Sequence, residues 1–358
     1  MITSMSGKGR RAAIYAISLT FILLVPLLYV FLRGERGAKV YKESKIAMDT
    51  IITLTVVSDS RGKTEAAIEA GFAEVARLEG LLSMFLPQSE VSLINDNSGV
   101  KAVKVSEDTY VLIKKAIEVA VLSGGAFDPT IGPVSKLWDF QKKIKPTDEQ
   151  IQANLPLVDY RDIVLDDSAR SVMLRRRGMV LDLGAIAKGY TADRIVEVLR
   201  AHGMAGGIVA IAGDIKTFGD KPDGSGWHVG VKRPRGDPNG ESNGDSKGEQ
   251  SALARVLTLR GEAVSTSGDY ERFFMDNGVR YHHLLEPSTG YPARDFQSVT
   301  VVNPEGRLTD SLSTAIFVMG RDKGMALVYK LNLKVYIIYS DATTYMSSNL
   351  KDSFQSPR

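Results

Sequence analysis

The feature that most constrains this chain is an apolar run near its start. Residues 12–32 read AAIYAISLTFILLVPLLYVFL and contain no charged side chain. A run of this length spans a bilayer as a helix, and Pro26 is tolerated in such a helix. A helix buried in a globular core is disfavoured, because the run has no polar face. Arg33 and Arg36 follow directly, without a small-residue cleavage site. We therefore predict that residues 1–38 form a cytoplasmic stub and an uncleaved transmembrane signal anchor.

The rest of the chain alternates between two hydrophobic periods. Apolar residues at helical spacing, such as Ile68, Phe72 and Val75, predict helices, whereas short runs rich in β-branched residues predict strands. We expect helices over residues 64–82, 106–123, 187–202 and 269–278, and another that begins near residue 310. We expect strands over residues 49–57, 179–182, 207–211, 227–231, 255–259, 281–285, 297–302 and 334–340. This order predicts an α+β fold with mixed sheets and packed helices.

Composition divides the chain further and excludes some functions. Residues 39–342 are expected to form one domain, which a short polar linker at residues 39–47 joins to the anchor. Residues 235–250 are rich in Gly, Asn, Asp and Ser, which predicts a flexible insertion, and the polar residues 343–358 predict a loose tail. A net charge of +3 gives no electrostatic reason to expect nucleic-acid binding. The absence of cysteine excludes disulfides, thiolate metal ligands and a cysteine nucleophile.

The stretch LDLGAIAKGY, at residues 181–190, combines a carboxylate, two glycines and a lysine. Gly184 and Gly189 allow a close approach of the backbone to a ligand. A helix that starts here would present N–H groups to a phosphate, and Lys188 would add a positive charge. An ordinary turn from strand to helix with a surface lysine explains the same residues.

The stretch TDSLSTA, at residues 309–315, combines a carboxylate with hydroxyls. Asp310 and Thr314 are four residues apart, so they share one face of a helix, with Ser313 beside them. Such an oxygen-only set suits Mg²⁺. The same residue types are also common at the start of a helix, where Asp310 would act as a cap.

The loop GGAFDPTIGPVSKLW, at residues 124–138, contains paired glycines, two prolines and a closing tryptophan. Such a loop wraps a planar ligand in some proteins and is a proline-fixed connection between helices in others. Farther along, His283 precedes a Pro-Ser-Thr-Gly turn. Histidine changes its charge near neutral pH and is a natural proton acceptor, although many histidines are structural. Its neighbour His282 points to the opposite face of a strand, so one of the two at most faces a given site.

The order of these motifs resembles the FAD:protein FMN transferases of the ApbE type. The family pattern begins at Met48-Asp49-Thr50 and continues with FLPQSEVSLIN from residue 85. It then runs through GAFDPTIGPVSKLW, LDLGAIAKGYTAD, TSGDYERFF, HHLLEPSTG and TDSLSTA. These ordered matches cover about three quarters of the chain, which makes them far more specific than one motif. Three positions depart from the family: Asp49 replaces a glycine, AIAGD at residues 210–214 replaces Asn-x-Gly-Gly-Asp, and Glu286 replaces an aspartate.

The resemblance implies an ApbE-like fold and a defined reaction. FMN would pass from FAD to a Thr or Ser hydroxyl of an acceptor protein, and AMP would leave. FAD is then the substrate, and Mg²⁺ is the cofactor. The implied metal ligands are the carbonyl of Ala185 and the side chains of Asp310, Ser313 and Thr314. The implied nucleotide contacts are Met48, Phe85, Ala126, Phe127, Asp128, Asp182, Lys188 and Leu284. His283 is our candidate for the catalytic base.

The resemblance also suggests where the protein works. Acceptors in this family are flavoproteins of extracytoplasmic electron-transfer systems. We therefore expect a single-pass protein of the inner membrane, with the catalytic domain on the periplasmic side. Basic residues flank residues 12–32 on both sides, so charge alone does not set this orientation.

Two other functions remain as alternatives: the first would use the same site, and the intact pair of Asp310 and Thr314 argues against the second. A Mg²⁺-dependent FAD pyrophosphatase would transfer FMN to water, and a non-catalytic FAD-binding protein would retain FAD without releasing AMP. Covalent FMN on an acceptor, free FMN, or the absence of AMP distinguishes the three functions.

Overall fold

A computed structural model describes residues 38–235 and 253–355 of the chain. The expected anchor within residues 1–38 and the expected insertion at residues 235–250 lie almost wholly outside the described residues. Within the described residues, no helix is both long enough and apolar enough to cross a membrane. The fold is that of the unit beginning at Val40.

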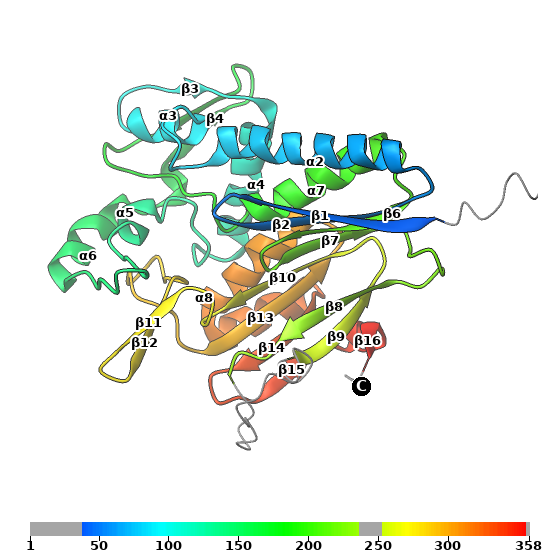
Figure 1. Cartoon of the computed structure of the whole chain (residues 1–358). Helices are drawn as coiled ribbons and strands as arrows, with labels where there is room; N and C mark the ends of the chain where they lie inside the picture. The colour runs from blue at the N-terminus through cyan, green and yellow to red at the C-terminus, as the bar shows by residue number, and fades with distance from the viewer. Residues whose placement is uncertain (1–37, 236–252, 356–358) are drawn as a thin grey trace, which may run out of the picture. The chain divides into compact units, whose positions relative to one another are not determined.

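An eight-stranded sheet lies at the centre of this unit, in the order β1-β2-β6-β7-β10-β13-β14-β15 (Figure 1). Its strands are β1 Lys39–Ala47, β2 Thr50–Ser58, β6 Gly206–Ile211, β7 Asp214–Phe218, β10 Ala263–Gly268, β13 Phe296–Asn303, β14 Lys334–Tyr339 and β15 Thr344–Met346. Neighbouring strands from β2 to β15 are antiparallel. All residues of β13 except the last are buried, because both faces of the sheet are covered.

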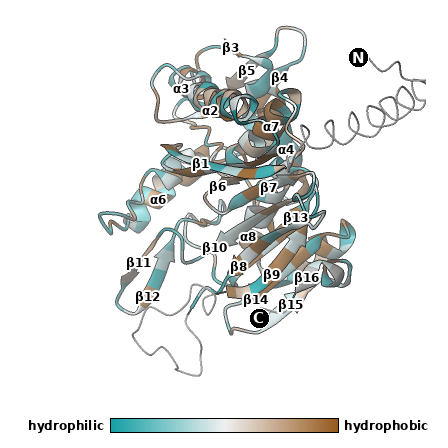
Figure 2. Cartoon of the chain, turned by 45° about the vertical axis from the view of Figure 1, so that its right-hand side comes forward, coloured by the Kyte–Doolittle hydropathy of each residue, from teal (hydrophilic) through white to brown (hydrophobic). Residues whose placement is uncertain are grey.

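Helices cover one face of this sheet, and a small sheet covers the other (Figure 1). The main helices are α2 Arg61–Leu82, α4 Glu107–Leu122, α7 Ala187–Ala201 and α8 Gly306–Lys330. The small sheet has the order β16-β9-β8, with β8 Trp227–Lys232, β9 Leu253–Leu259 and β16 Phe354–Gln355. Val301 of β13 packs on the helix side and Val302 on the side of the small sheet, as strand alternation requires. Figure 2 shows the hydrophobic residues of β13 and β9 in brown.

Shorter elements surround this core. They are the helices α3 Glu90–Asp96, α5 Gly132–Ser135 and α6 Asp148–Asn154, the 3₁₀ turns η1 Leu155–Leu157, η2 Tyr160–Asp162 and η4 Ser348–Ser353, the sheet β3 Val103–Lys104, β5 Ser171–Leu174 and β4 Ile163–Asp166, and the hairpin of β11 Phe273–Asp276 and β12 Val279–His282. The α+β class predicted from the sequence is therefore confirmed.

Three predicted segments differ from the structure. Residues 39–47, predicted as a linker, form the edge strand β1, whose lysines protect the open edge. The predicted helix at residues 269–278 is wrong, because Asn277 and Gly278 adopt positive φ angles of 47° and 77° and form the turn from β11 into β12. The predicted strand at residues 179–182 contributes only an isolated bridge from Val180 to Ile131.

The end of the chain is also more ordered than a loose polar tail. Residues 344–355 form β15, η4 and β16, which add to the central sheet and to the small sheet. Leu350 is fully buried in the core between these sheets. The polar composition concealed this role because only a few apolar side chains, Tyr345, Met346 and Leu350, pack the segment against the cores.

Two glycines set the distance between α7 and α8. A Cβ atom on Gly189 would lie 2.0 Å from the carbonyl oxygen of Gly306, and one on Gly306 would lie 2.5 Å from that of Gly189. The carboxylate of Asp193 accepts hydrogen bonds from the N–H groups of Gly306 (2.8 Å) and Arg307 (3.1 Å), and thereby caps α8. Gly189 therefore permits α7 to approach α8 closely. The sequence had suggested that this glycine permits the approach of a ligand instead.

We expect Gly189→Ala to lower the free energy of unfolding by about 3 kcal/mol, because the added methyl group meets backbone that cannot rotate away. Urea unfolding measures this loss. Gly80→Ala on the exposed side of α2 is the matched control, since no atom lies within 4 Å of its added Cβ. The control should be neutral or slightly stabilising. Equal urea midpoints for the two variants would show that α7 and α8 can move apart without a loss in the free energy of unfolding.

Candidate functional site

The crossing of α7 and α8 brings together charged side chains from three elements. The Nζ atom of Lys188, at the start of α7, lies 3.4 Å from Oδ1 of Asp310 on α8. It also forms an ion pair with Asp214, the first residue of β7. The N–H of Gly189 donates to Oδ2 of Asp310 at 3.1 Å. Both carboxylates are buried, so this is a preformed charged cluster in the interior.

The charges of this cluster do not balance. Burial opposes the charge on Lys188, but Asp214 and Asp310 outweigh burial and raise its pKa, so the lysine stays protonated. Burial and the carboxylate of Asp214 raise the pKa of Asp310 despite the nearby ammonium. Two carboxylates therefore share one cation, and the ionised form of Asp310 would be stabilised by further positive charge.

Hydroxyl groups adjoin Asp310 on the same side of α8. Oγ of Ser267, near the end of β10, lies 2.9 Å from Oγ of Ser313 and 3.0 Å from Oγ1 of Thr314. Ser313 also donates to the carbonyl of Asp310 at 2.9 Å. The structure thus joins the hydroxyls of Ser313 and Thr314 through Ser267, and connects Ser313 to the backbone of Asp310, so that the role of these residues as ligands stays a prediction.

Asp310 does not cap its own helix. The residue lies inside α8, whose first turn Asp193 caps, and its carboxylate accepts from the N–H of Gly189 in the first turn of α7. The N–H of Gly189 is engaged by Asp310, and the carbonyl of Ala185 has no backbone partner among the residues that the structure describes. That oxygen is therefore available to a ligand, as the resemblance implies.

Sequence reasoning missed two members of the cluster, Asp214 and Ser267. Asp214 ends the AIAGD stretch, which the sequence analysis noted only as a departure from the family. Ser267 lies in the TSGDYERFF motif, where no role was assigned. Their positions within these two motifs could have marked them as candidate site residues. Only the sheet topology shows that the strand ends that carry them lie next to α8.

The donor set fits a hard cation. One carboxylate, several hydroxyls and a free carbonyl are oxygen ligands of the kind that Mg²⁺ takes, together with phosphate oxygens and waters. The surplus negative charge around Asp310 favours the same conclusion. Among residues 38–235 and 253–355, no group of three or more His, Cys, Asp or Glu side chains is arranged as a metal centre. A cation here would accordingly depend on hydroxyls and on oxygens of the substrate.

His283 follows β12 directly and has a free ring nitrogen. Its Nδ1 atom is buried without a hydrogen-bond partner among the described residues, and its ring meets Phe140 edge-on at 6.5 Å. Burial, with the charges of Arg272 and the neighbouring His282, holds the pKa of His283 well below its usual value, and Lys188 acts in the same direction. The imidazole is therefore neutral at pH 7 and able to accept a proton.

His282 has the opposite character. Its Nε2 atom bonds to the carbonyl of Ala293 at 2.7 Å, and its Nδ1 accepts from the N–H of Leu284 at 3.3 Å. Burial lowers the pKa of His282 to about 4. Both ring nitrogens of His282 are occupied, whereas Nδ1 of His283 has no partner among the described residues, and the choice of His283 as the base stays a prediction.

The loop at residues 124–138 is fixed to the turn that follows His283. Asp128 accepts from the N–H of Thr130 (2.8 Å) and of Tyr160 (3.0 Å), so both of its oxygens hold the loop in shape. The indole N–H of Trp138 donates to the carbonyl of Gly290 at 3.2 Å. These contacts support the interpretation as a fixed connection and leave contact with a planar ligand as a prediction.

The other predicted nucleotide contacts have varied surroundings. Phe127 and Leu284 are buried in the main core, and Ala126 is partly buried next to them in sequence. Phe85 is 74% exposed, and Asp182 accepts from the N–H of Gly184 at 2.8 Å. No hydrogen bond or ion pair between described residues joins Phe85 to the Asp310 cluster, so its role stays a prediction.

Met48 lies in the turn between β1 and β2, and its N–H donates to Glu79 at 2.9 Å. Met48 and Asp49 both have positive φ angles, of 52° and 56°. Glycine adopts this conformation freely, and aspartate tolerates it. This explains why Asp49 can stand where the family has glycine.

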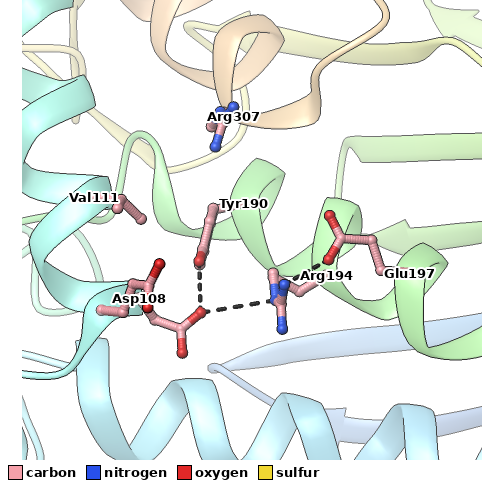
Figure 3. Close-up of a pocket in the computed structure, with 7 residues that line it drawn as sticks. Asp108, Val111, Tyr190, Arg194, Glu197 and Arg307 are labelled. Carbon is pink, nitrogen blue, oxygen red and sulfur yellow. Dashed lines mark hydrogen bonds and ion pairs between the residues drawn. The ribbon is translucent and has the colours of Figure 1, made fainter.

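A separate pocket of 400 Å³ lies between α4, α7 and the start of α8 (Figure 3). The hydroxyl of Tyr190 donates to Asp108 at 2.6 Å, and Arg194 lies 3.7 Å from Asp108 and 2.5 Å from Glu197. These contacts pair four of the polar side chains that line the pocket and tie α4 to α7. None of them was predicted as a site residue, and we assign the pocket a structural role.

Comparisons with known proteins identify the family to which the chain is similar. A model of the ApbE family matches residues 48–337. The FAD:protein FMN transferase of Treponema pallidum (strain Nichols) is 33% identical over 337 residues, which are 89% of this chain and 90% of the relative. That of Klebsiella pneumoniae (strain 342) is 35% identical over 291 residues, which are 80% and 85% of the two chains.

Solved structures show the same fold. The crystal structure of the ApbE protein from Thermotoga maritima MSB8 has a TM-score of 0.79 and 34% identity, and the match covers 89% of this chain and 100% of that one. The apo flavinyl transferase ApbE of Pseudomonas stutzeri has a TM-score of 0.75 and 27% identity, with 88% and 97% covered.

Proposed function

The chain belongs to the ApbE family, and from this membership we infer that it is an FAD:protein FMN transferase. Its relatives carry that name and match most of their own length. The observation that carries the inference to this chain is the buried cluster of Lys188, Asp214 and Asp310 beside three hydroxyls. Such a cluster suits the handling of a pyrophosphate, because phosphoryl transfer depends on positioning and charge neutralisation.

The reaction breaks one bond of the FAD pyrophosphate and forms one phosphoester. The oxygen of a Thr or Ser hydroxyl on the acceptor attacks the phosphorus that carries riboflavin. The bridging oxygen leaves with AMP, and the hydroxyl proton passes to a base. FMN is then held on the acceptor through a phosphoester.

Two side chains of this chain serve these steps. Lys188 remains protonated and offers its charge to the pyrophosphate, while Asp214 holds the ammonium in place. His283 accepts the hydroxyl proton, because its ring is neutral and one ring nitrogen is free. The indole of Trp138 fixes the neighbouring turn, so the loop before it and the turn after His283 keep their relative position.

We assign the cation to Mg²⁺, held by Asp310, Ser313, Thr314 and the carbonyl of Ala185. The oxygen-only donor set and the surplus negative charge support this assignment. When bound, the ion would neutralise phosphate charge that opposes an incoming hydroxyl. Ser267 touches two of these ligands and orients their hydroxyls.

The nucleotide contacts implied by the resemblance are part of the same proposal. Phe85 offers an exposed aromatic face for stacking on a flavin or adenine ring. Three further proposed contacts have buried side chains and would support the binding surface from below: Phe127, Asp128 and Leu284. The remaining proposed contacts are Met48, Ala126 and Asp182.

We further propose that the protein is anchored in the inner membrane by residues 12–32 and acts on an electron-transfer flavoprotein on the periplasmic side. The uncharged run supports this placement. Fractionation of the source organism is expected to recover the chain in the membrane fraction, with its N-terminal residues intact or lacking only Met1. A soluble form that begins after Leu32 would show that the run is a cleaved signal.

The function is tested by incubating the full chain with FAD, MgCl₂ and a periplasm-plus-membrane extract of the source organism. Covalent flavin is read as fluorescent protein bands on a denaturing gel, and the modified residue is identified by mass spectrometry. FMN on a Thr or Ser, with AMP in equal amount, supports the transferase. Free FMN without a labelled band indicates a pyrophosphatase, and FAD bound without AMP release indicates a binding protein.

A further inference from the structure

The hairpin of β11 and β12 projects from the rest of the fold as a sheet of two strands, so no described strand pairs with the outer edge of either one (Figure 1). The two strands pair with each other, from Phe273↔His282 to Asp276↔Val279, and form a sheet of their own. Among the strands that the structure describes, none pairs with the outer edge of β11. An exposed edge of this kind is a template for another strand.

The register shows which backbone groups are open. The N–H of His283 donates to the carbonyl of Arg272 at 3.1 Å, so these residues form a hydrogen-bonded pair. Because such pairs alternate along antiparallel strands, Phe274 bonds to β12, whereas Phe273 and Met275 direct their N–H and C=O groups outward. No described residue forms a hydrogen bond with these outward groups.

The same two residues expose apolar side chains. Phe273 is 37% exposed and Met275 is 51% exposed, whereas Phe274 between them is buried. The guanidinium of Arg280 lies 3.9 Å from the centre of the Phe273 ring. The edge therefore offers backbone hydrogen bonds, apolar contacts at alternate positions, and a positive charge.

The inner face of the hairpin is firmly held. Phe274 and Tyr281 stack at 5.5 Å, and Tyr281 stacks on Trp138 at 5.7 Å. The hairpin is thus packed, through Tyr281, against the loop that ends at Trp138.

Both ends of the hairpin lead into the proposed active site. His283, the candidate base, follows β12 directly. Ser267, which touches Ser313 and Thr314, precedes β11 by a short segment. A chain that pairs with β11 and continues toward the base of the hairpin therefore approaches the region where the hydroxyl must react.

We propose that the open edge of β11 docks the acceptor protein, whose segment around the modified Thr or Ser adds as an extended strand. The proposal rests on the transferase function, which requires a polypeptide to deliver a hydroxyl to His283. Main-chain hydrogen bonds would supply affinity, and apolar acceptor side chains at alternate positions would meet Phe273 and Met275.

Met275→Pro tests the backbone contact. Proline lacks the N–H group, and in this register that group is not used within the hairpin, so the ladder to β12 stays intact. Phe273→Ser tests the apolar contact separately. The probe is the protein that becomes fluorescent in the extract experiment, purified without its flavin. We expect each variant to raise the KM for this acceptor by about 10-fold, as the loss of one good contact predicts.

Affinity for FAD, measured by flavin fluorescence quenching, should be unchanged in both variants, which separates docking from damage to the site. Val121→Ser on α4 is the matched control, because Val121 is 59% exposed on another element. If Met275→Pro loses affinity for FAD, the docking proposal is judged from the acceptor KM of Phe273→Ser alone. The docking proposal would be overturned if the variants bind FAD normally and their KM for the acceptor equals that of the parent chain. Failure of the parent chain to label any protein would instead reject the transferase function.

Discussion

Asp310→Ala is expected to lower AMP release from FAD by more than about 10²-fold while the domain stays folded. Loss of a partner that merely supports a metal ligand typically costs about 10–100-fold, and Asp310 is the only carboxylate among the proposed ligands. The fold should persist because Asp193, and not Asp310, caps α8. Lys188 would keep its ion pair with Asp214, so no buried charge is left alone.

Two further variants separate the charge of Asp310 from its shape. Asp310→Asn keeps an oxygen that accepts from the N–H of Gly189 but removes the negative charge, and it should be as inactive as the alanine variant. Asp322→Ala, at an exposed position of α8, should retain parental activity. AMP release is measured by chromatography over a series of Mg²⁺ concentrations. An active asparagine variant with the parental Mg²⁺ dependence would show that Asp310 only links α7 to α8.

Local pattern was sufficient for the long elements of the fold. The helical spacing of Ile68, Phe72 and Val75 predicted α2, and these side chains pack in the core beneath it. The β-branched run at residues 49–57 predicted β2 within one residue at each end. Such segments bury one continuous face, so their periodicity is visible without knowledge of the partner.

The hairpin of β11 and β12 could not be assigned in the same way. Its strands are short, and their buried residues, Phe274 and Tyr281, pack against Trp138 from a distant loop. The Asn277-Gly278 turn is the local signal of this hairpin, because Asn-Gly is the residue pair that two-residue hairpin turns favour. β1 was missed for a related reason, since its residues are mostly exposed and its sheet partner supplies the hydrogen bonds.

Prediction of the site shows the same limit. Asp310, Ser313 and Thr314 share one helix face, so spacing alone placed them together. Asp214 and Ser267 join them only because β7 and β10 are adjacent, with Ala263 opposite Lys216. That register places residues from distant parts of the chain at the same end of two neighbouring strands, and no local sequence pattern encodes this pairing.

His283→Ala should slow FMN transfer by roughly 10²–10⁴-fold, the usual contribution of a general base, while affinity for FAD changes little. The pH dependence gives an independent signature. A lowered pKa keeps the imidazole neutral to lower pH, so kcat/KM for FAD should be flat near pH 7 and fall only in acid, below the ordinary titration range of histidine. Because this limb reports the base of the free enzyme, His283→Ala should lack it.

His282→Ala is the matched control, and its structural role makes its expected effect different in kind. The substitution leaves the N–H of Leu284 and the carbonyl of Ala293 without their partner in a buried region, which should cost about 1–3 kcal/mol of stability. Transfer at a temperature where the variant is folded should stay near the parental rate, because His283 keeps its free nitrogen. Turnover is read as covalent FMN on the acceptor, and FAD affinity as fluorescence quenching, for both variants. The base assignment is wrong if folded His282→Ala is the slower enzyme, or if His283→Ala loses FAD affinity in proportion to turnover, since a proton acceptor acts on the hydroxyl and not on the bound nucleotide.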